Sequence, residues 1–235
     1  MRSRARTASL IALFAATSVH AEPLPVLLDL VARNARFPSP ARADVKLERQ
    51  DRGATTVVRA VMLGSGRTIY VETRDGTRAL VRPGKVILRT GTRVARAAPD
   101  ARLAGSDVLL EDLAVFTPGL LKIPQVSDEG PTGIVVTGAP GMPSARALIV
   151  LTIDPNDHTI VRTKYYERSI SNLAAFGRNE DFQSVDGHQR PGRMTVEGTL
   201  DRTTTRLDFT WRPAPDTPRA VFTPAGLLAA STITW

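Results

Sequence analysis

The sequence predicts a mainly β protein of the α+β class, in which one large antiparallel sheet curls and short helices cover part of it. About ten runs are rich in β-forming residues, and several of them alternate apolar and polar positions with a period of two. Helical spacing is confined to two short stretches. Because strands and helices do not alternate along the chain, a parallel α/β sheet is excluded.

The first 21 residues have the organisation of a secretory signal peptide. Three arginines precede an apolar run over residues 8–19, and small residues lead up to the Ala21-Glu22 junction. The run is too short to cross a bilayer, which takes roughly 20 apolar residues. We therefore expect cleavage near Ala21-Glu22, a single domain over residues 22–235 outside the cytoplasm, and no stable membrane insertion.

Composition narrows the possible partners. The chain has no cysteine, so it has no disulfide and no cysteine for a lipid anchor. Its net charge is +8, or +5 without the three arginines of the signal peptide. The basic residues are scattered and form no basic helix or aromatic ladder. This distribution excludes a nucleic-acid-binding protein. The charge is compatible with anionic lipid head groups or an acidic partner.

A short amphipathic helix is predicted at the start of the mature chain. Its apolar positions recur at helical spacing: Leu24, Leu27, Leu28 and Val31. Pro38 and Pro40 are expected to end this helix, because proline lacks an amide hydrogen and disfavours helix in the residue before it.

From residue 44 onward the period changes to two. Strands are expected around 57–62 and over 67–73, 77–82, 85–90, 133–137, 146–153, 159–167, 193–200 and 204–211. Asp75-Gly76 predicts a tight hairpin turn, and Asp154–Asp157 predicts another. Val58 and Met62 share one face of their strand. Leu207, Phe209 and Trp211 share one face of the last strand.

The segment 105–116 interrupts the strands. Ser106 or Asp107 can cap a short helix, with Leu109, Leu110 and Leu113 on its apolar side and Glu111 and Asp112 pointing outward. Three prolines at 118, 124 and 131 then predict a loop-rich stretch.

The residues offer little for catalysis or metal binding. His158 and His188 both lie in predicted turns or loops, without the spacing of paired metal ligands. Asp107 and Glu111 are four residues apart and could perform general acid–base chemistry, but a capping role and a favourable interaction with the helix dipole explain them more simply. We predict a protein that is not an enzyme and that has no catalytic residues, no metal and no cofactor.

One string resembles a family signature. Gly105-Ser106-Asp107 followed by Glu111-Asp112-Leu113 resembles the Gly-Ser-Asp-x-x-x-Glu-Asp-Leu pattern of LolA/LolB-like outer-membrane lipoprotein-sorting proteins. The stretch from Ile153 to Tyr166, with its Asp-Pro turn, and the segment from Asp216 to Pro224 are similar to two further parts of that family. The chain departs from the family at residues 108–110, where aromatic side chains are common, and this leaves the cargo open.

The resemblance implies a strongly curved, open antiparallel half-barrel. Its apolar concave face, covered by helices, would shield lipoprotein or lipid acyl chains on their way across the periplasm from the inner to the outer membrane. It also implies an inner-membrane transporter and an outer-membrane acceptor as partners. The alternative is an envelope sensor or interaction module that uses the same fold to dock a lipoprotein or a transporter, and that would show a second domain or a protein-binding patch.

The candidate cavity residues follow from these patterns. The two helices would act as a lid through Leu27, Leu28, Val31, Leu109, Leu110 and Leu113, and the groove would be lined by Val58, Met62, Leu207, Phe209 and Trp211. Core packing explains each of them equally well, because strand parity identifies a buried face but not a void behind it.

Overall fold

In the computed structural model of the chain, residues 22–130, 133–231, 233 and 235 are described. The signal peptide expected over residues 1–21, and Pro131, lie outside these residues. The elements in chain order are α1 (Leu24–Ala35), β1 (Phe37–Asp51), β2 (Ala54–Gly66), β3 (Thr68–Thr73), β4 (Arg78–Arg82), β5 (Lys85–Thr90), β6 (Arg93–Arg96), η1 (Leu110–Leu113), η2 (Pro118–Leu120), β7 (Leu121–Gly130), β8 (Gly133–Pro140), β9 (Arg146–Ile153), β10 (Ile160–Glu167), β11 (Leu173–Glu180), β12 (Gln183–Val185), β13 (His188–Arg190), β14 (Arg193–Gly198), β15 (Thr204–Pro213), η3 (Arg219–Phe222) and α2 (Pro224–Leu228).

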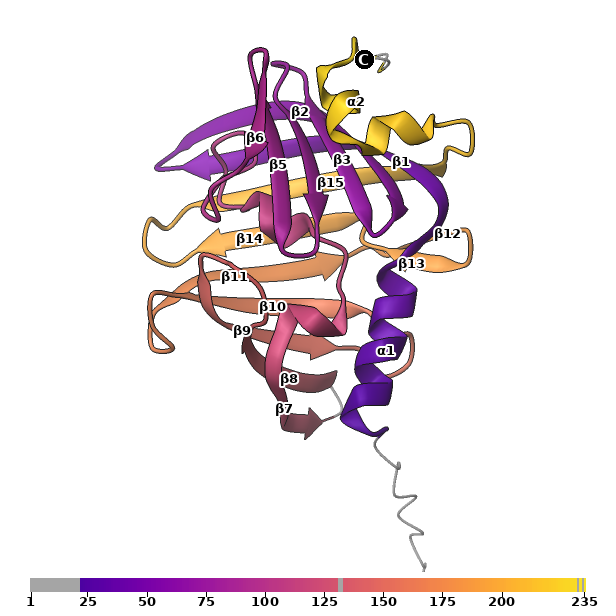
Figure 1. Cartoon of the computed structure of the whole chain (residues 1–235). Coiled ribbons are helices and arrows are strands. Elements are labelled where there is room, and N and C mark those ends of the chain that lie inside the picture. The colour runs from indigo at the N-terminus through magenta and orange to yellow at the C-terminus, as the bar shows by residue number, and fades with distance from the viewer. Residues whose placement is uncertain (1–21, 131–132, 232, 234) are drawn as a thin grey trace, which may run out of the picture.

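Thirteen of these strands form one antiparallel sheet, in the order β6-β5-β4-β3-β2-β1-β15-β14-β11-β10-β9-β8-β7. Its two ends, β6 and β7, are not paired with each other, so the sheet curls without closing (Figure 1). The central pairing joins β1 to β15, from Ala41 opposite Pro213 to Gln50 opposite Thr204. This pairing places the first and last strands of the chain side by side (Figure 1). The predicted fold class, a curved antiparallel half-barrel with short covering helices, is confirmed.

Helix α1 covers the inner face at the β7–β9 end of the sheet. Its buried residues Leu27, Leu28, Val31 and Ala32 pack against Phe116, Leu121, Val136, Leu151 and Ile153. The hairpin β12–β13 lies beside the last turn of the helix (Figure 1). The predicted helix is therefore confirmed, and it buries the predicted face.

Pro38 and Pro40 do not end this helix, because it stops at Ala35 and strand β1 already begins at Phe37. Arg190 binds the end of the helix by donating to the carbonyl oxygens of Asn34, Ala35 and Arg36. The strand accommodates the two prolines because its register against β2 shifts between Phe37 and Ala41, where regular pairing is interrupted.

Several other segments differ from the sequence-based expectation, including β6 and the hairpin β12–β13, where His188 begins a strand although a loop was expected. The stretch expected to be loop-rich contains β7, an edge strand whose register is irregular between Lys122 and Gln125, and an edge strand with a bulge tolerates Pro124. Strand β11 was not predicted, because its alanines and Gly177 are weak strand formers. Pairing with β10 and β14 on either side compensates for that weakness. The predicted Asp75-Gly76 turn is confirmed, and there the Thr77 amide donates to the Asp75 carboxylate at 3.0 Å.

The C-terminal segment packs on the outer face of β2–β5 (Figure 1). Phe222 and Leu227 are buried against Val61, Leu63, Tyr70, Leu80 and Ile87. Arg82 donates to the carbonyl oxygen of Phe222 at 2.8 Å, and Arg89 donates to that of Leu227 at 3.1 Å. The C-terminal segment therefore buries part of the convex face of the sheet in a third hydrophobic cluster.

Truncation of Leu227 tests how strongly this segment is held. Leu227 is 0% exposed and its neighbour Leu228 is 53% exposed. Leu227→Ala should lower the free energy of unfolding by about 2–5 kcal/mol, because a fully buried leucine leaves a cavity. Leu228→Ala should change it by less than about 0.5 kcal/mol. Urea denaturation measures both, and equal values would contradict the packing described.

Candidate functional site

A cavity of about 270 Å³ lies between the concave face of the sheet, α1 and the segment from Glu111 to Leu121. Its wall is mostly apolar, with contributions from Met62, Leu113, Ile149, Met194, Phe209 and Trp211. Its volume is close to the lower end of the roughly 300–1,000 Å³ typical of small-molecule sites.

The cavity lies where two hydrophobic clusters meet. One cluster surrounds the β1–β15 pairing, and the other lies under α1. Ala35 and Ile149 pack against both clusters and also line the cavity. The void is therefore bounded by two cores that come from different parts of the sheet.

The structure brings some of the sequence-derived candidates to this cavity and leaves others in the core. Val31, Met62, Leu113, Phe209 and Trp211 line the cavity. Leu27, Leu28, Leu109, Leu110 and Leu207 are buried in core packing and are not among the lining residues, and Val58 is partly buried against the main cluster.

One wall carries an aromatic group. The rings of Phe37 and Trp211 have their centroids 5.7 Å apart, and those of Phe209 and Trp211 are 5.9 Å apart and nearly parallel. The Trp211 indole donates from Nε1 to the carbonyl oxygen of Pro191 at 2.9 Å. The polar atom of this tryptophan is thus satisfied by a backbone carbonyl, while its ring lines the cavity.

Ile149 lines the cavity in regular alternation with Leu151, and a register irregularity in β9 brings Arg146 to the same wall. The register between β9 and β10 shifts next to Glu167, so that Arg146 and Ile149, three residues apart, both face the cavity. Strict alternation would place these two side chains on opposite faces. The sequence offers no signal for this irregularity.

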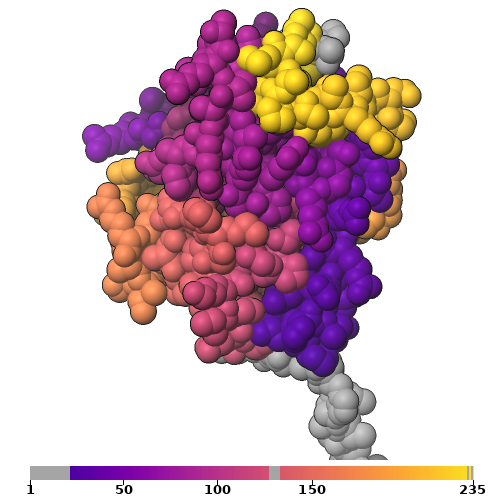
Figure 2. Space-filling view, in the orientation of Figure 1, coloured from indigo at the N-terminus to yellow at the C-terminus, as the bar shows by residue number. Residues whose placement is uncertain are grey.

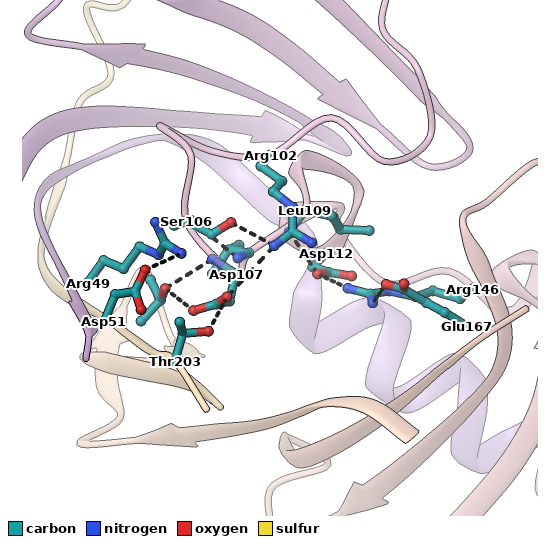
Figure 3. A network of polar contacts seen from close by, with 12 residues as sticks. Arg49, Asp51, Arg102, Ser106, Asp107, Leu109, Asp112, Arg146, Glu167 and Thr203 are labelled. Atoms are coloured by element: carbon teal, nitrogen blue, oxygen red, sulfur yellow. Dashed lines mark hydrogen bonds and ion pairs between the residues drawn. The ribbon is translucent and has the colours of Figure 1, made fainter. Parts of the chain in front are cut away.

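Asp107 fastens the Gly-Ser-Asp string to the sheet (Figure 3). Its carboxylate accepts hydrogen bonds from Thr203 at 2.7 Å and Thr205 at 2.8 Å, and its own amide donates to Thr205 Oγ1 at 3.0 Å. Arg102 adds an ion-pair contact at 3.7 Å. Neither Asp107 nor Ser106 caps the following helix as expected, because Asp107 is committed to the β14–β15 end of the sheet and Ser106 accepts from the Val108 amide.

Asp112 provides the cap instead, by accepting from the Leu109 amide at 3.0 Å. The helix it caps, η1, is a single 3-10 turn. Asp112 was expected to point outward, but its side chain is only 2% exposed and pairs with Arg146 at 2.6 Å, also 2% exposed (Figure 3). The charge on Arg146 stabilises the carboxylate in this buried position.

Arg146 connects several groups on the cavity wall. It also pairs with Glu167 and lies over the ring of Tyr165, 4.3 Å from its centroid. Burial opposes the charge on Arg146, but Asp112, Tyr165 and Glu167 together outweigh it, so the pKa of Arg146 is raised. Burial also raises the pKa of Tyr165, so this phenol stays neutral.

Glu111, also expected to point outward, is partly buried and belongs to a different part of the network. It accepts from the Ser144 hydroxyl at 2.8 Å and from the Ala145 amide at 3.2 Å. Burial raises the pKa of this carboxyl group. Asp107 and Glu111 therefore bind different segments of the chain, and the structure does not assemble the acid–base pair that their spacing suggested.

Arg190 is the second cation on the cavity wall. Its guanidinium lies 4.2 Å from the centroid of the Phe37 ring and donates to the carbonyl oxygens that end α1. Burial lowers the pKa of Arg190 to about 10. This arginine connects α1 to β13 and to the aromatic wall.

The histidines do not form a metal site with one another. His158 contacts Glu22 at 3.3 Å, and His188 contacts the carbonyl oxygen of Asn34 at 3.2 Å. Across the described residues, no group of three or more potential ligands is close enough to hold a metal ion. None of the helices found there has the length and hydropathy of a membrane span.

Loss of the Asp112 charge should destabilise the fold. Asp112→Asn removes one of the two carboxylates paired with the buried Arg146 and should lower the free energy of unfolding by about 1.5–3 kcal/mol, because Glu167 remains as a partner. Glu111→Gln is the matched control. It should cost less than about 1 kcal/mol at neutral pH, because the wild-type carboxylate there is opposed by burial and has no cation bonded to it. Chemical denaturation measures both, and equal losses would contradict the importance of the ion pair.

Comparisons with known proteins identify the fold. No protein-family model and no curated protein matches the chain. Among solved structures, it is similar to a DUF1329 family protein from Desulfovibrio piger, with a TM-score of 0.73 and 16% identity over 87% of this chain and 99% of that one. A LolA superfamily protein from Nitrosomonas europaea gives 0.69 and 19%, covering 85% and 96%.

An outer membrane lipoprotein-sorting protein domain from Vibrio parahaemolyticus gives a TM-score of 0.70 and 16% identity, covering 86% of this chain and 98% of that one. At these identities the likeness establishes the fold. The likeness agrees with the family resemblance of the Gly105–Leu113 string. In that string, the buried carboxylates of Asp107 and Asp112 fix the segment that lies across the concave face. The chain therefore has the LolA-like half-barrel fold.

Proposed function

We propose that the mature protein, residues 22–235 after cleavage near Ala21-Glu22, is a periplasmic single-domain carrier that binds acyl chains of lipoproteins or other lipids without chemical reaction. The cavity between the two concave clusters carries this proposal. The Vibrio parahaemolyticus relative is described as a lipoprotein-sorting domain, which names a class of cargo consistent with an apolar site.

The energetics favour an apolar chain as the ligand. Transfer of methylene groups from water to an apolar site contributes about 0.8 kcal/mol each, so a chain of 14–16 carbons gains on the order of 10 kcal/mol before ordering costs. A chain of that length needs more room than about 270 Å³. Because α1 borders the cavity and packs on the sheet through apolar side chains, the extra volume can come from a shift of α1 relative to the sheet, without unfolding the main core.

The polar groups of the wall support binding rather than catalysis. The Asp112 carboxylate is bound to Arg146 and to a backbone amide, and Glu111 is bound to Ser144 and Ala145. The Ser144 hydroxyl also accepts from the Arg146 amide, and within the described residues no histidine is bonded to either carboxylate. A carboxyl or ester group at the end of an acyl chain would still find donors near the cavity, where Asn34, Gln189 and Arg190 contribute to the wall.

Native mass spectrometry tests the proposal. The protein is exported to the periplasm, purified gently and weighed intact, and bound molecules are then extracted into organic solvent. We expect lipid or acylated peptide at near one molecule per protein. A homogeneous folded protein that carries nothing and does not take up added fatty-acyl probes would overturn the carrier proposal and favour the sensor or docking module.

Two neighbouring residues of β9 offer a matched pair of variants. Ile149 lines the cavity, whereas Leu148 is next to it in the strand and is not among the lining residues. Ile149→Trp should weaken binding of a fluorescent C16 fatty-acyl probe at least tenfold by filling the void, and Leu148→Trp should change it less than twofold. Circular dichroism checks that both variants are folded. Equal affinities would place the ligand elsewhere.

A further inference from the structure

Positive charge is concentrated at the β4–β6 end of the sheet. Residues 76–99 contain six basic side chains and no acidic one. Arg78 is buried and pairs with Glu72. The remaining five form what we call the basic edge: Arg82, Lys85, Arg89, Arg93 and Arg96.

The charges of the basic edge are not neutralised by carboxylates. Arg82, Arg89 and Arg96 donate to backbone carbonyl oxygens, which leave their formal charge intact. Lys85, Arg93 and Arg96 are exposed. None of the five forms an ion pair within the ranges that the structure describes. Several surface cations elsewhere are paired with carboxylates, such as Arg206 with Asp208 and Arg212 with Asp44.

Exposed apolar side chains accompany this edge. The C-terminal segment lies against β4–β6, and Figure 2 shows the two side by side at one end of the molecule. There Leu228 is 53% exposed next to Leu227, whose carbonyl oxygen binds Arg89. Trp235 is 49% exposed, two residues after Ile233, which packs on the same cluster.

We propose that the basic edge, together with Leu228 and Trp235, docks the protein on the surface of an anionic phospholipid bilayer. Basic side chains attract anionic head groups, and tryptophan and leucine partition into the interfacial region. An acidic protein would satisfy the charges, but it gives no particular role to a half-exposed tryptophan and leucine beside them.

The edge also adjoins the cavity. Arg96 donates to the carbonyl oxygen of Gly84, and Gly84 lines the cavity, where it packs closely against Met142. A molecule docked through the basic edge would therefore hold this rim of the cavity close to the bilayer. Docking itself requires no cavity ligand, so it can be tested apart from the carrier proposal.

Vesicle flotation with the mature protein is the test. Vesicles of phosphatidylcholine alone are compared with vesicles containing roughly one third phosphatidylglycerol. We expect the protein to float with the anionic vesicles and not with the neutral ones. Salt at about 0.5 M, where screening shortens electrostatic interactions to a few Å, should weaken the binding.

Two triple variants with equal net charge separate the edge from general basicity. Lys85→Gln, Arg93→Gln and Arg96→Gln together should weaken binding at least tenfold, because each basic residue near an anionic surface contributes roughly fivefold. The control replaces Arg33, Arg162 and Lys164 by Gln. These cations are exposed on α1 and β10, outside the edge, and binding should fall less than threefold.

Each outcome decides the matter. Failure of the wild-type protein to bind anionic vesicles would overturn the docking proposal and make the basic edge a candidate site for an acidic protein. An equal loss of binding in both triple variants would also overturn the proposal. Ile149→Trp, which fills the cavity, should bind vesicles as the wild-type protein does. If the cavity binds no acyl chain but vesicle binding persists, only the carrier proposal fails.

Discussion

The buried carboxylates of Asp107 and Asp112 fix the segment between β6 and β7 across the concave face of this half-barrel. An open sheet with a concave apolar face needs something to lie across that face, and the chain uses the segment between β6 and β7, which has no strand partners of its own. Asp107 binds it to Thr203 and Thr205 at one side, and Asp112 binds it to Arg146 on β9. Because each buried carboxylate has several donors, the segment is fixed in one position and the charges are compensated.

This arrangement leaves the covering segment and α1 with different means of attachment. The segment is fixed by buried polar bonds, whereas most of α1 is held by apolar packing and only its last turn by hydrogen bonds of Asn34 and Arg190. Apolar packing is non-directional, so the first turns of α1 can pivot about its hydrogen-bonded last turn with little loss of specific bonding, while the segment cannot. The cavity lies between the two, which makes α1 the element most able to adapt to a bound chain.

Much of the fold could be predicted from the sequence, but the roles of individual residues could not. The alternation along β15, the Asp75-Gly76 turn and the spacing of α1 are local signals, and all three are confirmed. The inward position of Asp112 depends on Arg146, 34 residues away, and the position of Arg146 depends on an irregularity in the pairing of β9 with β10. Such features arise from contacts between distant segments, which residue periodicity does not report. The resemblance of the Gly105–Leu113 string pointed to the fold, but its residues have structural roles.

The location of a bound acyl chain tests the central claim most directly. A crystal of the protein with a fatty acid brominated near the end of its chain would show the bromine by anomalous scattering. We expect the bromine inside the cavity, in contact with Ile149 and the Phe209–Trp211 wall, with α1 displaced from its position in the empty protein. Bromine found only on the outer face, or absent from well-ordered crystals that leave the cavity unchanged, would contradict the account of this fold as an acyl-chain carrier.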